Sequence, residues 1–298
     1  MEYRQLGSRT GLAVSAIGFG GAPIGLQNYL SAEDRNSPKF HAQAINAIGL
    51  AIELGVNYFD TAPGYGEGRS EAIFGEALRG SRERVVLATK YPVGDCWNPD
   101  DATAGVRDCV ARLRTDYVDL LQLHGNTFSD TKAESILASG VLDWADSMRG
   151  AGLCRFTGIT AEGPSGALER LLLTGRFDVI EIQYNILYQA ACDYQRKPTG
   201  IAVLAKSLGM GVTAMRPATS GLFQRIVRSV VPDVDSGVLT GLAINYVLST
   251  PEIDCAVVGM CSEDEVRKNV AIASDTASRL DLHALHQRYV SNSPEDPK

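Results

Sequence analysis

Three apolar runs in the first half of the chain each end on a side chain that can gain or lose a proton. These side chains are Asp60, Lys90 and His124. The steps between them, roughly 30 residues each, match a strand followed by a helix and the next strand. Tyr65 follows a Pro-Gly turn just after Asp60. Because parallel strands end at the same edge of a sheet, we expect these four groups to meet there.

Strand-like and helix-like segments alternate along most of the chain. The expected strands cover residues 14–20, 56–60, 85–90, 118–124, 155–160, 178–183, 211–215 and 255–258. The expected helices cover residues 42–54, 70–80, 101–113, 132–149, 165–173, 200–208, 238–248 and 263–273. The strands are apolar runs, as in a parallel sheet that is buried on both faces. This order predicts the α/β class and one (β/α)8 TIM barrel domain over residues 1–298.

Both ends of the chain carry further signals. Turn-forming residues 7–11 lie in a short polar stretch and predict an N-terminal hairpin across the barrel floor. Residues 292–298 are polar and proline-rich, and we expect a disordered tail. A doubly wound dinucleotide-binding fold is disfavoured. Its glycine fingerprint is only loosely matched at residues 18–23, where Pro23 interrupts the expected helix.

Composition narrows the classes of partner and compartment. The net charge is −7 and no run of basic residues occurs, so neither nucleic acid nor a membrane is expected as a partner. No apolar run is long enough to span a membrane, and the first residues lack the apolar core of a secretory signal. The six cysteines lack close paired spacing, which favours a reduced cytoplasm and no metal site. The oligomeric state stays open.

The order of these motifs resembles the aldo-keto reductase family. The Asp-Thr-Ala-x-x-Tyr-Gly element at residues 60–66, Lys90 and the Leu-His pair ending at His124 resemble its catalytic tetrad. Further stretches follow the family pattern in order. They are residues 68–71, 152–160, 183–185 and 258–259, followed by Asn269. The resemblance implies a nicotinamide-dependent oxidoreductase that interconverts an aldehyde, ketone or aldose with its alcohol or lactone.

The four convergent side chains suit that chemistry. Hydride reduction of a carbonyl places negative charge on oxygen, so the site needs a proton donor and positive potential. Tyr65 is the expected general acid, and Lys90 is the cation expected to make its phenol more acidic. Asp60 would keep Lys90 charged, and His124 would orient the carbonyl. The resemblance implies the same roles.

The cofactor is inferred from the resemblance, because nothing in the tetrad carries hydride. Thr160 and Gln183 match positions that hold the nicotinamide ring in the family. Two residues depart from the family pattern, since Ala161 replaces an asparagine and Met215 replaces a stacking tyrosine. Met215 can still pack against a flat ring through its thioether.

The rest of the dinucleotide is expected over the last two strands. Arg216, Ser220 and Gly221 lie where the family's loop wraps the pyrophosphate. Gly259 ends the last strand, and Asn269 matches the residue that contacts adenine. Glu265 stands where an arginine that grips a 2′-phosphate is common, and it follows two further acidic residues. Such acidity favours NAD(H) over NADP(H).

Substrate walls are expected from loops after the early strands. Tyr29, Trp97 and Asn126 are the candidates. An aromatic face beside polar side chains suits a small hydroxylated carbonyl compound, such as a sugar or lactol.

Two other functions remain open at this stage. A Schiff-base lyase of the aldolase type would use Lys90 as its nucleophile, although the Asp60 carboxylate would keep that amine protonated. A cofactor-sensing regulatory subunit would keep the barrel without turnover, and some relatives of this fold are of that kind. Borohydride trapping tests for the lyase, and turnover with aldehydes and aldoses tests for the regulatory subunit.

Overall fold

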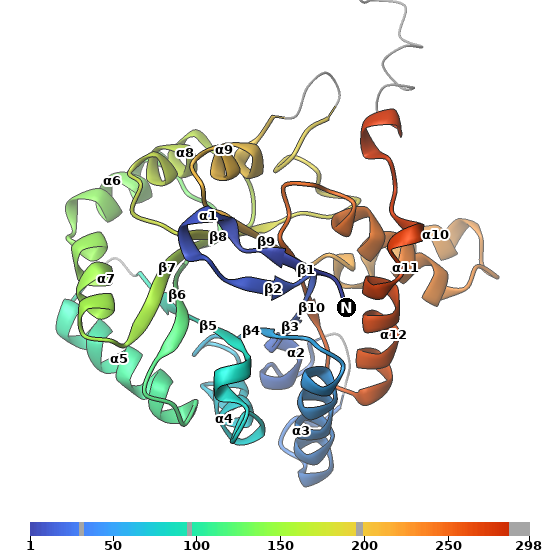
Figure 1. Ribbon diagram of the computed structural model, residues 1–298, viewed down its shortest axis with the longest axis horizontal. Helices are drawn as coiled ribbons and strands as arrows, with labels where there is room; N and C mark the ends of the chain where they lie inside the picture. Colours follow the sequence, from blue (N-terminus) through green and yellow to red (C-terminus); the bar gives the residue numbers. More distant parts are fainter. Residues whose placement is uncertain (30–32, 94–96, 195–198, 286–298) are drawn as a thin grey trace, which may run out of the picture.

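The computed structural model describes residues 1–29, 33–93, 97–194 and 199–285. Within these ranges, eight parallel strands close into one barrel in the order β10, β3, β4, β5, β6, β7, β8, β9. The barrel strands are β3 (Ile17–Gly20), β4 (Tyr58–Asp60), β5 (Val86–Pro92), β6 (Val118–His124), β7 (Cys154–Ala161), β8 (Val179–Gln183), β9 (Gly211–Met215) and β10 (Cys255–Gly259). Helices surround the strands (Figure 1). The predicted (β/α)8 barrel is confirmed.

The helices follow the predicted order with local differences. They are α2 (Ala22–Gly25), α3 (Pro38–Glu53), α4 (Arg69–Ala77), α5 (Pro99–Arg112), α6 (Asp130–Ala138), α7 (Val141–Gly150), α8 (Gly166–Leu173), α9 (Ile201–Ser207), α10 (Leu222–Val230), α11 (Ser236–Leu248) and α12 (Glu263–Ser274). The single helix expected over residues 132–149 is two helices, because Gly140 adopts a φ of 77° between them. Helix α10 was not predicted, and none of its residues is buried.

The strand expected over residues 14–20 is divided between two sheets. Its first part, β2 (Ala13–Ser15), pairs antiparallel with β1 (Tyr3–Gln5), and the short helix α1 (Gly7–Thr10) connects them. The Arg4 guanidinium ties this hairpin to the barrel by donating to the carbonyl oxygens of Ile253 and Leu248 at 2.8 and 2.7 Å. Figure 1 shows the hairpin lying across the strands. The predicted N-terminal hairpin is therefore confirmed.

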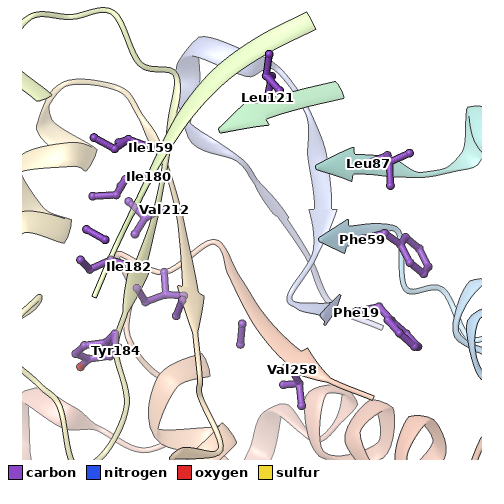
Figure 2. Close-up of a cluster of buried hydrophobic side chains, with 14 of the residues drawn as sticks. Phe19, Phe59, Leu87, Leu121, Ile159, Ile180, Ile182, Tyr184, Val212 and Val258 are labelled. Carbon is purple, nitrogen blue, oxygen red and sulfur yellow. The ribbon is translucent and has the colours of Figure 1, made fainter. Parts of the chain in front are cut away.

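Side chains along each barrel strand alternate between the outside and the inside. Phe59 and Leu87 pair in register on β4 and β5, and they belong, with Leu121 on β6, to the apolar layer shared with the helices (Figure 2). Successive strand residues point to opposite faces. Asp60, one residue after Phe59, and Lys90, three residues after Leu87, therefore face the barrel interior. The same parity applies to His124, three residues after Leu121.

Three further observations bear on the expectations from composition. The described cysteines are Cys109, Cys154, Cys192, Cys255 and Cys261, and all are free and buried. Among the described helices, none has both the length and the apolar character needed to cross a bilayer. Cys96 and the predicted tail at residues 292–298 lie outside the described residues.

Candidate active site

A cavity of 540 Å³ opens where the barrel strands end. Most of the predicted site residues line it. They are Tyr29, Asp60, Tyr65, Lys90, His124, Asn126, Thr160, Met215, Arg216, Ser220, Gly221 and Gly259. Four other predicted residues lie off its wall: Trp97, Gln183, Glu265 and Asn269. We call this space the main cavity.

Lys90 and Asp60 form a buried ion pair at one end of the main cavity. Lys90 and Asp60 are each 2% exposed. Lys90 Nζ lies 2.6 Å from both carboxylate oxygens of Asp60 and also donates to the Thr61 carbonyl oxygen at 3.0 Å. Burial alone would lower the pKa of Lys90, but Asp60 and the nearby Glu181 outweigh it and the pKa rises. The ammonium is therefore charged and held in one position.

Tyr65 is held beside this pair by a tight loop between β4 and α4. The Tyr65 amide donates to the Ala62 carbonyl oxygen at 3.0 Å, and its own carbonyl accepts from the Ser70 amide at 3.2 Å. Gly25 of α2 packs directly against the loop, since a Cβ there would lie 2.1 Å from the Tyr65 carbonyl oxygen. These contacts therefore fix the backbone at Tyr65.

The Tyr65 ring lies near both Lys90 and His124. Lys90 Nζ is 5.2 Å from the ring centroid, and the His124 ring is edge-on at a centroid distance of 6.2 Å. Burial raises the pKa of Tyr65 to about 12; Lys90 lowers it in part, while Asp60 and Glu181 raise it. The sequence suggested a more acidic phenol. The structure differs because two carboxylates and desolvation outweigh the single lysine.

His124 is neutral at physiological pH. Burial, with a smaller contribution from Lys90, lowers its pKa to about 4. A neutral imidazole carries one N–H, so it can donate a hydrogen bond to an oxygen without adding a charge. This suits a residue that orients a carbonyl group.

Two residues that sequence reasoning missed complete this end of the cavity. Glu181 on β8 is 2% exposed, and its Oε2 lies 3.8 Å from Lys90 Nζ. Gln122 on β6 donates from Nε2 to Asp60 Oδ1 at 3.2 Å and to Glu181 Oε2 at 3.0 Å. A carboxylate in the middle of an otherwise apolar strand was the available signal for Glu181.

Thr160 and Gln183, which were expected to hold the nicotinamide ring, form hydrogen bonds within the protein. The Thr160 hydroxyl accepts from the Gly125 amide at 3.0 Å and donates to the Gly125 carbonyl oxygen at 2.9 Å. This pairing fixes the backbone next to His124. Gln183 is off the cavity wall, and its Oε1 accepts from Arg216 at 3.1 Å. Their cofactor contacts stay predictions.

Arg216 begins an unusual loop at the opposite end of the cavity. Its guanidinium lies 2.8 Å from Glu162, a cavity residue that sequence reasoning also missed. Both side chains are well exposed. Arg216, Thr219 and Ser220 all have positive φ values, of 56°, 57° and 50°, and Gly221 follows with 75°. Such backbone costs energy in residues other than glycine and concentrates at functional loops.

The start of α12 differs from the expected row of free carboxylates. Glu265 forms a capping box with Ser262, and its carboxylate accepts from the Cys261 amide at 2.8 Å. Lys268 Nζ pairs with Asp264 at 2.6 Å. Asn269 is buried in the same helix. The negative charge that was expected to repel a 2′-phosphate is thus largely engaged within the helix.

The predicted substrate residues fall into two groups. Tyr29 and Asn126 line the main cavity. Trp97, with Tyr91, instead lines a second cavity of 330 Å³ that shares Lys90 with the main cavity, and the Trp97 ring packs edge-on against Trp144 at 5.0 Å. Trp97 thus packs against aromatic side chains and lies off the wall of the main cavity.

Comparisons with known proteins agree with this geometry. The Aldo/keto reductase family model matches residues 16–236. L-galactose dehydrogenase of Arabidopsis thaliana is 30% identical, over 93% of this chain and 90% of that protein. An aldo-keto reductase from Bacillus halodurans in its holo form has a TM-score of 0.72 at 24% identity, over 97% of this chain and 96% of its own. An aldo/keto reductase from Klebsiella pneumoniae in complex with NADP and acetate has a TM-score of 0.70 at 20% identity, over 100% and 98%. These two structures share its fold.

Proposed function

The chain belongs to the aldo/keto reductase family, and we propose that it is a nicotinamide-dependent oxidoreductase acting on a small carbonyl compound. The reaction would interconvert an aldehyde or ketone with its alcohol, or an aldose in its lactol form with the lactone. One observation carries the proposal. Tyr65, His124 and the bonded pair of Lys90 and Asp60 line the same cavity.

Each of the four side chains has a distinct task in this proposal. Tyr65 donates its phenolic proton to the carbonyl oxygen in reduction, and in oxidation its phenolate takes the proton back. Lys90 stabilises the phenolate while the proton is away, and Asp60 keeps Lys90 charged and in place. His124, being neutral, donates an N–H to the same oxygen and thereby positions it.

We propose that the main cavity holds the dinucleotide in an extended form. The cavity is lined by Tyr65 and Lys90 and also by Ser220, Gly221 and Gly259. When bound, the nicotinamide supplies or accepts the hydride. Met215 would pack against its ring, Thr160 and Gln183 would lie beside it, and Arg216 would face the pyrophosphate. Its NADP complex makes the Klebsiella pneumoniae relative a precedent for this kind of ligand.

The form of the dinucleotide is less constrained than the acidic sequence suggested. Glu265 accepts hydrogen bonds in a helix cap and Asp264 pairs with Lys268, so part of their negative charge is offset. The Klebsiella pneumoniae relative binds the phosphorylated form. We therefore propose a nicotinamide dinucleotide, without a preference for NAD(H) over NADP(H).

A sugar-like substrate is supported by one relative and by the cavity wall. The Arabidopsis thaliana relative is an L-galactose dehydrogenase. Tyr29 and Asn126 offer an aromatic face and an amide near His124, a combination that suits several hydroxyl groups. We propose aldoses and their lactols as the first substrates to test.

Two measurements on the same preparation test the proposal. Intrinsic fluorescence is titrated with NADH and NADPH in parallel, and turnover is then measured with a panel of aldehydes, ketones and aldoses. We expect saturable binding of at least one cofactor and carbonyl-dependent oxidation of it. Cofactor binding without turnover across the panel would support the regulatory alternative instead.

The lyase alternative has its own test. The raised pKa of Lys90 keeps its amine protonated, and Asp60 occupies it from both carboxylate oxygens. A Schiff base requires a free amine. We expect borohydride to trap no adduct between Lys90 and a carbonyl substrate, and a trapped adduct would replace the oxidoreductase proposal.

A further inference from the structure

A second carboxylate lies against Lys90, and the proposed reaction leaves it without a task. Asp60 alone provides a close ion-pair partner, with Lys90 Nζ 2.6 Å from both of its oxygens. Glu181 on β8, three strands from β5 around the barrel, reaches the same ammonium at 3.8 Å. Burying a charged group is costly unless it interacts with partners. The proposed reaction therefore does not explain why a glutamate is buried at this position.

Gln122 fixes the position of both carboxylates. Its Nε2 donates to Asp60 Oδ1 at 3.2 Å and to Glu181 Oε2 at 3.0 Å. Because an amide nitrogen is a donor and a carboxylate oxygen an acceptor, these two contacts also determine the orientation of the amide. Lys90 is thus held between two carboxylates whose separation Gln122 sets.

The titratable groups whose pKa values are influenced by the Glu181 charge come from several elements of the barrel. They are Tyr58 and Asp60 on β4, Tyr65 after β4, Lys90 on β5, His124 on β6 and Cys255 on β10. Lys90 is the one cation among them. With both carboxylates ionised, this group of side chains would carry one more negative than positive charge.

Excess negative charge acts directly on the phenol of Tyr65. Burial raises the pKa of Tyr65, Lys90 lowers it, and both Asp60 and Glu181 raise it. The Glu181 carboxylate also contributes, after burial, to the raised pKa of Asp60. In a medium of low dielectric, such interactions between charges are much stronger than in water. Removal of the Glu181 charge should therefore make Tyr65 more acidic.

We propose that Glu181 is a positioning residue that holds Lys90 opposite Asp60 and adds a buried negative charge to the site of the Tyr65 hydroxyl. The catalytic role of Glu181 rests on the proposed function. A phenol that retains its proton serves carbonyl reduction over a wide pH range. Oxidation of an alcohol needs the phenolate and is confined to more alkaline pH. Glu181 would thus set the pH ranges in which the two directions operate.

Titration of Tyr65 in the cofactor-free protein tests this directly. The protein is labelled with carbon-13 at the tyrosine Cζ position, and the Tyr65 resonance is assigned by its loss in Tyr65→Phe. Its ionisation is followed with pH in wild type and Glu181→Gln. We expect the ionisation constant of Tyr65 to increase at least about tenfold in Glu181→Gln. Glu181→Asp keeps the charge and should restore most of the wild-type behaviour.

Two further variants distinguish the loss of the Glu181 charge from a structural change. Glu169→Gln removes an exposed carboxylate on α8 and should leave the Tyr65 titration unchanged. Glu181→Met has a similar volume and no charge, and should reproduce the shift of Glu181→Gln. Circular dichroism at each pH restricts the comparison to folded protein. A Tyr65 titration that is the same in wild type, Glu181→Gln and Glu181→Met would overturn the proposal.

The pH dependence of turnover gives a second readout and separates the two proposals. In Glu181→Gln, the alkaline limb of carbonyl reduction should move to lower pH together with the Tyr65 titration. A protein that turns over carbonyl compounds but shows no change in the Tyr65 titration contradicts the role of Glu181 alone. A shifted Tyr65 titration in a protein that reduces no carbonyl supports the role of Glu181 and counts against the proposed function.

Discussion

The two ends of the main cavity hold their charges in different ways. At the reaction end, Lys90, Asp60 and Glu181 are buried and contact one another. At the dinucleotide end, Arg216 pairs with Glu162 while both side chains remain well exposed. Water screens exposed charges, whereas buried charges depend on their protein partners. The first end is thus a fixed electrostatic unit, and the second can exchange its partners when a ligand binds.

The strongest test of the difference between buried and exposed charges replaces one lysine at the reaction end and one on an exposed helix. Lys90→Met leaves Asp60 and Glu181 buried without their cation, and we expect the free energy of unfolding to fall by about 3–5 kcal/mol. Lys268→Met is the matched control, because Lys268 pairs with Asp264 on the exposed face of α12. That variant should show no measurable loss. Urea denaturation gives the free energy of unfolding of both variants. Equal losses would contradict the difference between buried and exposed charges.

Removal of one carboxylate from the reaction end should have a smaller effect. Asp60→Asn keeps the shape of the side chain, and Glu181 still faces Lys90 at 3.8 Å. We expect a loss of about 1–3 kcal/mol, which is less than in Lys90→Met. The double variant Asp60→Asn with Glu181→Gln should lose more than the sum of the single variants. Additive losses would mean that the two carboxylates do not share Lys90.

Acid should lower the stability of the folded protein through His124 at the reaction end. Its pKa is lowered to about 4 from the ordinary value of 6.5. The unfolded chain therefore binds this proton at a higher pH than the folded chain does. This contribution to stability is complete above pH 6.5 and is lost as the pH falls towards 4. Because the imidazole is partly exposed, we expect the effect to be on the order of 1 kcal/mol.

His124→Asn checks that expectation. The variant should lose less stability than wild type when the pH is lowered from neutral to about pH 5. Thermal unfolding at both pH values gives the difference. If wild type and variant lose the same amount, then His124 is not the group that senses the acid.

The smallest change is expected at the dinucleotide end. Glu162→Gln breaks an exposed ion pair, so stability should change by less than about 0.5 kcal/mol. Arg216 is then free to face the pyrophosphate, and affinity for the dinucleotide should rise by roughly twofold to fivefold. Glu169→Gln is the control for loss of a surface charge. A decrease in affinity in Glu162→Gln would show that Glu162 itself helps to bind the cofactor.

The reaction end was largely predictable from the sequence. The repeated strand and helix lengths placed Asp60, Lys90 and His124 at one edge, and strand parity turned them all inward. The sequence did not identify Glu181 as a site residue, because Val179, Ile180 and Ile182 make β8 resemble a continuous apolar run. Its contact with Lys90 depends on closure of the barrel, which joins strands far apart in the sequence.

The dinucleotide end was less predictable for a physical reason. Side chains there act through exposed loops and caps, whose geometry depends on local backbone angles. Glu265 has the same charge whether it binds a ribose or caps α12, and only the structure shows the cap. In the same way, Arg216 has a positive φ, and its guanidinium contacts Glu162 and Gln183. Sequence patterns indicate residue types here but not their partners.

The most direct test of the central claim is a single-turnover measurement with Tyr65→Phe. Enzyme loaded with reduced cofactor is mixed with a carbonyl substrate, and the rate of cofactor oxidation is recorded as a function of pH. We predict that wild type loses activity at alkaline pH as Tyr65 ionises. In Tyr65→Phe the rate should fall by about 10²–10⁴-fold and lose this pH dependence, with cofactor affinity nearly unchanged. A variant that keeps most of the wild-type rate and the same alkaline limb would contradict the account.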